Sequence, residues 1–243
     1  MRAWGVSDPG MVRSENQDAF AICQLGGESL LAMVCDGMGG ARAGNIASGL
    51  ALDVFSGEIR RGWKGAMTAQ RVQRLLRSAT ELANQAVFEQ SRSSEDYYGM
   101  GTTLVAAVMR GREADVINVG DSRAYHVSDR GIRPVTVDHS MVQLMVGRGE
   151  LTQAEARRHP GKNIITRAVG TERQVEGDLY HLRLEDGECL LLCSDGLSNV
   201  VTDQEILFEV IHGQNREDCC RRLLEIAKNR GAPDNVTAIL IGD

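Results

Sequence analysis

The hydrophobic residues follow two patterns, one typical of helices and one typical of strands. Along the chain these patterns predict helices and strands in separate clusters. Apolar residues at helical spacing predict two long helices at 43–60 and 67–92, and two more near the C-terminus at 203–212 and 216–228. Strands and helices that cluster in this way favour an α+β fold over strictly alternating βαβ units. Short runs rich in branched aliphatic residues predict eight β-strands, at 19–25, 30–35, 103–109, 115–119, 124–127, 178–184, 189–193 and 236–241.

Residues 140–165 interrupt this pattern. They are highly charged and carry little β signal, and only short helical pieces are predicted, at 141–146 and 152–157. No stretch rich in proline or serine divides the chain into parts. We therefore expect a single domain, residues 1–243, with a flap of about residues 140–165 inserted between strands.

The composition is that of a globular protein, and it excludes several classes of function. The 243 residues are 42% hydrophobic and 25% charged, whereas aromatic residues make up only 4%, too few for a platform that stacks nucleic-acid bases. The net charge of −6, without a long basic run, argues against binding to a nucleic-acid backbone. Neither a membrane span nor a secretory signal is visible, so we expect a cytoplasmic protein whose six cysteines stay free.

Acidic residues stand beside glycine where predicted strands end. Three apolar runs end in this way, at Asp36, Asp121 and Asp195, while Asp18 and Asp234 open two other predicted strands. An Asp-Gly pair by itself is typical of a hairpin turn. The pairs at 36–37 and 195–196, however, lead towards helices and do not join adjacent strands. Strands that end in this way would gather several carboxylates at one end of a sheet core.

Crowded carboxylates repel one another unless a cation neutralises them. Oxygen ligands without histidine or cysteine suit Mg²⁺ or Mn²⁺, so the pattern predicts a carboxylate-bound metal centre with one or two ions. Two ions would favour in-line displacement at phosphorus by an activated water. Other phosphate chemistries lack their motifs here, because the chain contains no nucleotide-binding P-loop, no Cys-x5-Arg and no Asp-x-Asp.

Eight short segments follow one another along almost the whole chain: RSENQD at 13–18, VCDGMGG at 34–40, GTT at 101–103, VGDSR at 119–123, DHS at 138–140, ITRAVG at 165–170, LCSDGL at 192–197 and DNVT at 234–237. In this order they resemble the metal-dependent protein phosphatases, the PP2C or PPM family of Ser/Thr phosphatases, and in particular its bacterial members. The resemblance implies two antiparallel β-sheets packed face to face and flanked by helices, a four-layer α/β/β/α sandwich with a small flap.

The resemblance also implies a role for each candidate site residue. The planar guanidinium of Arg13 would bind the substrate phosphate. Two core ions, Mn²⁺ or Mg²⁺, and a third, weaker ion would be held by carboxylates and one carbonyl. Asp36 would bridge the two core ions, with the Gly37 carbonyl as a further ligand. Asp195 and Asp234 would complete the coordination shell of the first ion, and Asp18 would hold the waters of the second. Asp121 together with Asp195 would bind the third ion.

The implied activity is hydrolysis of phosphoserine and phosphothreonine in proteins by in-line attack of a metal-bridging water. The expected partner is a bacterial Ser/Thr kinase whose phosphorylation the enzyme reverses, and we expect a monomer. Two alternatives remain open at this point. One is a catalytically silent, metal-loaded module that binds phosphoproteins, and the other is a phosphatase for a phosphoester that is not a protein.

One position departs from many eukaryotic relatives. Where these carry a histidine directly after the Asp-Gly pair, a residue thought to act as a general acid, this chain has Met38. A thioether cannot donate a proton, so the leaving alkoxide must be protonated by water or by a more distant group such as His139. We favour water, because the sequence Asp138-His139-Ser140 is more typical of a turn that opens the flap.

Overall fold

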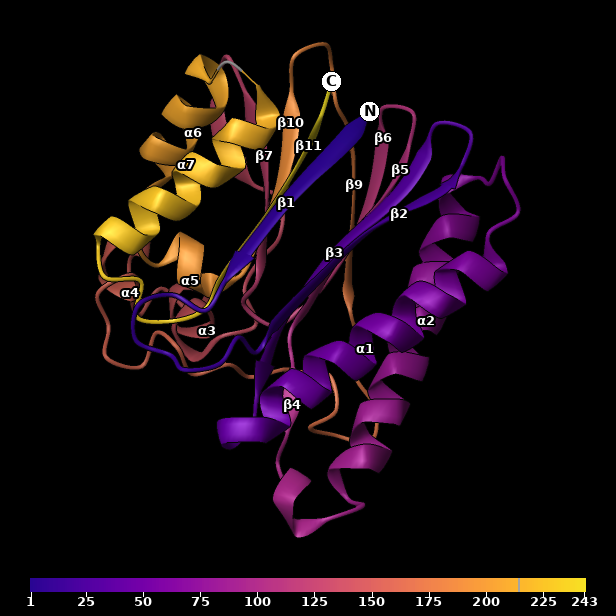
Figure 1. Cartoon of the computed structure of the whole chain (residues 1–243), viewed down its shortest axis with the longest axis vertical. Coiled ribbons are helices and arrows are strands. Elements are labelled where there is room, and N and C mark those ends of the chain that lie inside the picture. Colours follow the sequence, from indigo (N-terminus) through magenta and orange to yellow (C-terminus); the bar gives the residue numbers. More distant parts are fainter. Residues whose placement is uncertain (214) are drawn as a thin grey trace.

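Two antiparallel β-sheets form the centre of the molecule, and helices cover the outer face of each (Figure 1). The computed structural model describes residues 1–213 and 215–243, apart from the side chains at positions 41 and 42. The first sheet has the strand order β1 (Arg2–Asp8), β11 (Val236–Gly242), β10 (Cys189–Cys193), β7 (Arg123–Ser128) and β8 (Gly131–Pro134). The second has the order β2 (Asp18–Gly26), β3 (Ser29–Met38), β5 (Leu104–Arg110), β6 (Glu113–Val119) and β9 (Asp178–Arg183), while the short β4 (Gly101–Thr102) pairs with the end of β3.

Two pairs of helices form the outer layers. Helices α1 (Gly40–Gly62) and α2 (Ala69–Ser91) pack on the second sheet, and α6 (Asp203–His212) and α7 (Arg216–Asn229) pack on the first (Figure 1). Four shorter helical segments lie in the connections: η1 (Glu95–Tyr97), α3 (Met141–Gly147), α4 (Gln153–Ala156) and α5 (Asp195–Ser198). In the described part of the chain, no helix is both long and apolar enough to cross a membrane.

Three apolar layers hold this sandwich together. The middle layer lies between the sheets and joins residues such as Leu30 and Met109 of the second sheet to Leu190 and Ile239 of the first. The outer layers pack each sheet against its own helices. The central strands are therefore buried on both faces, which explains why they appear in the sequence as continuous apolar runs without polar alternation.

The expected α+β sandwich is confirmed, with all eight predicted strands, the four long helices and the two short ones of residues 140–165. Helix α6 begins at the expected residue because Thr202 and Glu205 form a capping box. All six cysteines are free and buried, as expected. Three strands, β1, β4 and β8, lie outside the eight predicted ones. Strand β1 contains one branched aliphatic residue, Val6, and as an edge strand it stays partly exposed, so it lacks the apolar run that marks the inner strands.

Candidate active site

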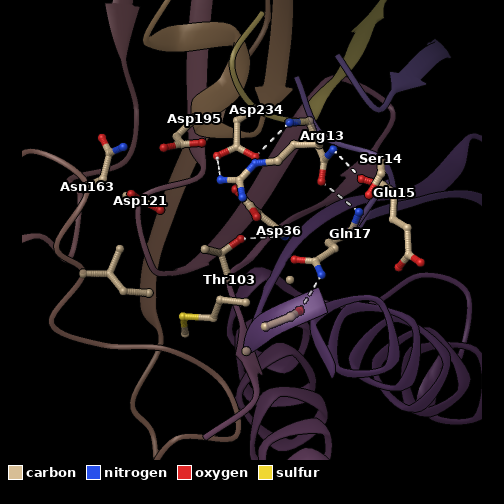
Figure 2. A pocket seen from close by; sticks show the side chains of 16 residues that line it. Arg13, Ser14, Glu15, Gln17, Asp36, Thr103, Asp121, Asn163, Asp195 and Asp234 are labelled. Carbon is tan, nitrogen blue, oxygen red and sulfur yellow. Dashed lines mark hydrogen bonds and ion pairs between the residues drawn. The ribbon is translucent and has the colours of Figure 1, made fainter. Parts of the chain in front are cut away.

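An open cavity of about 580 Å³ lies where one end of both sheets meets the loop between β1 and β2 (Figure 2). Four of the five candidate acids line it: Asp36, Asp121, Asp195 and Asp234. Arg13 reaches into it from the loop, and the segment after α4 contributes Asn163 and Ile165. The cavity thus joins side chains from both ends of the chain.

The antiparallel ladders explain why acids far apart in sequence meet here. Strand β10 ends two residues before Asp195, and its neighbour β11 begins two residues after Asp234, so the two acids share one edge of the first sheet. In the second sheet, Asp18 opens β2 directly opposite Asp36 in β3. Asp121 follows β6, where the chain crosses from the second sheet to the first. The carboxylates therefore gather at one end of the sheet core, as expected, and neither Asp-Gly pair forms a hairpin.

Burial and mutual repulsion disturb the protonation of these acids. Burial raises the pKa of Asp121 to about 8, and repulsion from Asp195 adds to the effect. The pKa values of Asp36 and Asp195 are raised for the same two reasons, and the strongest repulsion comes from Asp18 for Asp36 and from Asp234 for Asp195. A group of acids whose charges oppose one another in this way is stabilised by a bound cation.

Asp18 is buried and does not line the cavity. The hydroxyl of Ser194 donates a hydrogen bond to its Oδ2 atom at 2.7 Å, whereas its Oδ1 atom is buried without a hydrogen-bond partner among the described residues. Burial raises its pKa to about 6. A buried carboxylate oxygen without a hydrogen-bond donor is costly, and a divalent ion or its water shell would supply the missing partner.

Gly37 lines the cavity beside Asp36, and only glycine fits its position. A Cβ atom there would overlap the carbonyl oxygen of Gly44, because the backbone of β3 and the start of α1 lie too close together to leave room for a side chain. Thr103 fixes the neighbouring acid, because its hydroxyl accepts a hydrogen bond from the Asp36 amide at 2.9 Å. Both residues hold the backbone of the acidic cluster rigid.

The Arg13 side chain points towards the acids, and one of its terminal nitrogens lies 2.8 Å from Asp234 Oδ2 (Figure 2). This ion pair raises the pKa of the guanidinium still further, so Arg13 stays charged. Its side chain is 56% exposed and faces the open cavity, where an incoming anion could reach it.

The donor set of the cavity fits a hard divalent cation, because it consists of carboxylates and carbonyls, with the unpartnered oxygen of Asp18 buried next to it. Among the described residues, no three His, Cys, Asp or Glu side chains form a group that could enclose a metal ion as they now lie. Water would therefore fill part of the coordination shell of an ion bound here.

The structure corrects the expected turn at 138–140. The carboxylate of Asp138 does not close a turn on its own backbone but accepts three hydrogen bonds from Arg123. The Nδ1 atom of His139 accepts a hydrogen bond from the amide of Gly120 at 3.1 Å, and its Nε2 atom faces Asp178 at 3.3 Å. His139 is therefore buried behind Asp121 and does not line the cavity.

Comparison with known proteins agrees with the fold. The family model for protein phosphatase 2C matches residues 12–240. The chain belongs to the protein phosphatase 2C family. It is 34% identical over 238 residues to the serine/threonine phosphatase stp of Listeria monocytogenes, covering 97% of this chain and 93% of that protein.

Two solved structures show how closely the fold agrees with that of other protein phosphatases 2C. The S. agalactiae serine/threonine phosphatase superimposes with a TM-score of 0.93 at 33% identity, covering 100% of this chain and 99% of that one. The serine/threonine phosphatase Stp1 of Staphylococcus aureus superimposes with a TM-score of 0.93 at 35% identity, covering 99% of this chain and 94% of that one.

Sequence reasoning assigned no role to several residues of the cavity in this protein phosphatase 2C chain, or to Ser194 outside it. Asn163 and Ile165 line the cavity from the segment expected to be a flap, and only Ile165 belongs to one of the family segments, ITRAVG. Ser194 and Asn235 act through hydrogen bonds to residues far away in the sequence. Their places in the segments LCSDGL and DNVT, directly beside Asp195 and Asp234, were the signal that the sequence offered.

Proposed function

We propose that this chain is a phosphoprotein phosphatase that hydrolyses phosphoserine and phosphothreonine. The observation that carries the proposal is the cluster of carboxylates at one open cavity, with Asp36 and Asp121 held at raised pKa values and Arg13 as the cation beside them. The relatives of this protein phosphatase 2C chain are named serine/threonine phosphatases, which supports the choice of substrate.

The acids of the cavity hold Mn²⁺ or Mg²⁺ in this proposal, as two core ions and a third, weaker one. The ligands are Asp36, the carbonyl of Gly37, Asp195, Asp234, Asp18 and Asp121. Bound ions of this kind supply a nucleophile at neutral pH by lowering the pKa of a water. The unpartnered Oδ1 atom of Asp18 and the repulsion among the acids support this assignment.

Arg13 binds the phosphate in this proposal, because a guanidinium can donate two parallel hydrogen bonds to phosphate oxygens. Met38 lines the cavity but has no proton to give, and His139 lies outside it. The proton for the leaving alkoxide therefore comes from water. Residues 140–165 form the flap beside the site, which contributes Asn163 and Ile165 to the cavity wall.

The biological setting follows from the substrate. The partner is a Ser/Thr kinase whose phosphorylation this enzyme reverses, and the enzyme acts as a monomer. Six free cysteines suit a reducing compartment such as the cytoplasm.

Turnover of an aryl phosphate and of a phosphothreonine peptide, with added Mn²⁺ and with EDTA, tests the proposal. We expect turnover of both substrates with Mn²⁺ and none with EDTA. A chain that binds the phosphopeptide with Mn²⁺ present but turns over neither substrate is instead a silent phosphoprotein reader. Faster turnover of small phosphorylated metabolites than of phosphopeptides would assign the enzyme to a phosphoester that is not a protein.

A further inference from the structure

The loop that carries Arg13 is held by bonds to other parts of the chain, among them those from the Met11 amide to the Ala232 carbonyl at 3.0 Å and from the Gln17 side chain to the Gly40 carbonyl at 2.7 Å. We call residues 9–17, which connect β1 to β2 without regular secondary structure, the Arg13 loop. The side chains at its tip face solvent, with Met11 61% and Val12 70% exposed. A phosphate-binding side chain on such a loop needs an anchor, because a shift of about 1 Å is enough to weaken a well-aligned contact.

One buried side chain from the other end of the chain supplies this anchor. Asn235 is 4% exposed, and its amide makes three hydrogen bonds to the Arg13 loop. Its Nδ2 atom donates to the carbonyl of Pro9 at 3.0 Å and to that of Glu15 at 2.9 Å. Its Oδ1 atom accepts from the backbone amide of Gln17 at 2.8 Å. A single side chain therefore ties both ends of the loop together.

The chemistry of the position requires an amide. Asparagine offers two donors and an acceptor on one short stem, and here all three are used. Aspartate would keep the bond from Gln17 but lose both donations, leaving two carbonyls of the loop without these partners. Serine and alanine would lose most or all of the three bonds.

The anchor also sets the distance between Arg13 and the acids. Asn235 directly follows Asp234, which pairs with Arg13, and Gln17 directly precedes Asp18. We propose that Asn235 is a positioning residue that holds the Arg13 guanidinium over the place where the substrate phosphate binds. This inference rests on the proposed function, in which Arg13 contacts that phosphate.

A double-mutant cycle tests the coupling on a phosphothreonine peptide with Mn²⁺. We expect Arg13→Ala to raise KM about 10–100-fold through the lost charge-assisted contacts, and Asn235→Ala to raise it about tenfold. The double variant should bind hardly worse than Arg13→Ala alone, because without Arg13 the anchor has nothing left to position. If the increase in KM of the double variant equals the product of the increases of the two single variants, the inference is wrong.

Asn84→Ala is the matched control. Asn84 is 1% exposed, and its amide likewise ties down a loop, by accepting from Gly170 at 2.7 Å and donating to the carbonyl of Glu172 at 3.0 Å. Asn84 does not contact the Arg13 loop. In a variant that combines Asn84→Ala with Arg13→Ala, the two effects on KM should therefore multiply. If Asn235→Ala does not fold, Asn235→Ser takes its place in the cycle.

A second measurement does not depend on activity. In the presence of EDTA, trypsin should cut after Arg13 about tenfold faster or more in Asn235→Asp than in the wild type, and Asn84→Ala should leave this cut unchanged. Equal rates in Asn235→Asp and the wild type would refute the anchor. If Arg13→Ala alone leaves KM and kcat unchanged, the phosphate role proposed for Arg13 fails, whatever the trypsin result shows.

Discussion

Buried carboxylates at the two ends of the second sheet differ in what surrounds them. Asp115, in β6 under the start of α2, has no exposed surface, and its oxygens accept from Arg110 at 2.7 Å, from His181 at 2.9 Å and from Gln73 at 3.3 Å. Asp18 and Asp36, at the other end of the second sheet, have no Lys, Arg or His within ion-pair distance among the described residues.

The difference separates a structural acid from a functional one. The chain supplies its own cation to Asp115, so that charge is neutralised as soon as the fold forms. At Asp18 and Asp36 the described residues supply no such cation, and the cost is visible as raised pKa values. In the proposed function, the bound ions neutralise this charge. Removing a carboxylate should therefore have opposite effects at the two places.

The largest effect is expected for Asp36→Asn. It removes the acid assigned to both core ions, so we expect kcat for an aryl phosphate to fall by several orders of magnitude. The unfolding temperature in EDTA should stay the same or rise, because a repelling buried charge is gone. Unchanged turnover in this variant would contradict the assignment of the acidic cluster.

Asp115→Asn should show the reverse pattern. It leaves Arg110 without its charged partner, and we expect a loss of about 3 kcal/mol in the free energy of unfolding, measured with urea. Turnover by the folded fraction should stay close to that of the wild type, because Asp115 lies outside the cavity. A large loss of kcat without a loss of stability would erase the distinction between the two groups.

The pH dependence of stability should sharpen the comparison for the ion-free protein. Asp18, with a pKa of about 6, and Asp121, with a pKa of about 8, bind protons more tightly in the folded state than in the unfolded state, where the value is about 3.8. Their contribution to stability is thus complete below pH 3.8 and is lost as pH rises through 6 to 8. The unfolding temperature in EDTA should fall over this range. Asp121→Asn should remove the part of this decrease in unfolding temperature that occurs near pH 8. Saturating Mn²⁺ should abolish the decrease.

The smallest effect is expected for His139→Ala. A general acid contributes about 10²–10⁴-fold, whereas His139 is hydrogen-bonded to Gly120 and faces away from the cavity, so kcat on a phosphothreonine peptide should stay within a few-fold of the wild type. A loss of 100-fold or more on the peptide, with little loss on an aryl phosphate, would identify His139 as the proton donor.

Local sequence pattern predicted most of the strands and helices and the acids at the strand ends, but not the side-chain contacts that hold the site together. Inner strands such as β3 and β10 contain long apolar runs, and the acids stand at the ends of those runs, so both features are visible in the sequence. The pairing of Asp138 with Arg123 and the contacts of Asn235 join residues with no shared periodicity. Such contacts depend on three-dimensional register, which a single sequence does not reveal.

The pairing of β1 with β11 makes the complete cavity one of the last features that a growing chain can form. Arg13 and Asp234 are 221 residues apart, and at about 5–20 residues per second the ribosome needs on the order of ten seconds or more to connect them. Until β11 leaves the exit tunnel, the cavity lacks Asp234 and the Arg13 loop lacks its anchor. A nascent or truncated chain therefore has no complete site with which to strip phosphate from its neighbours.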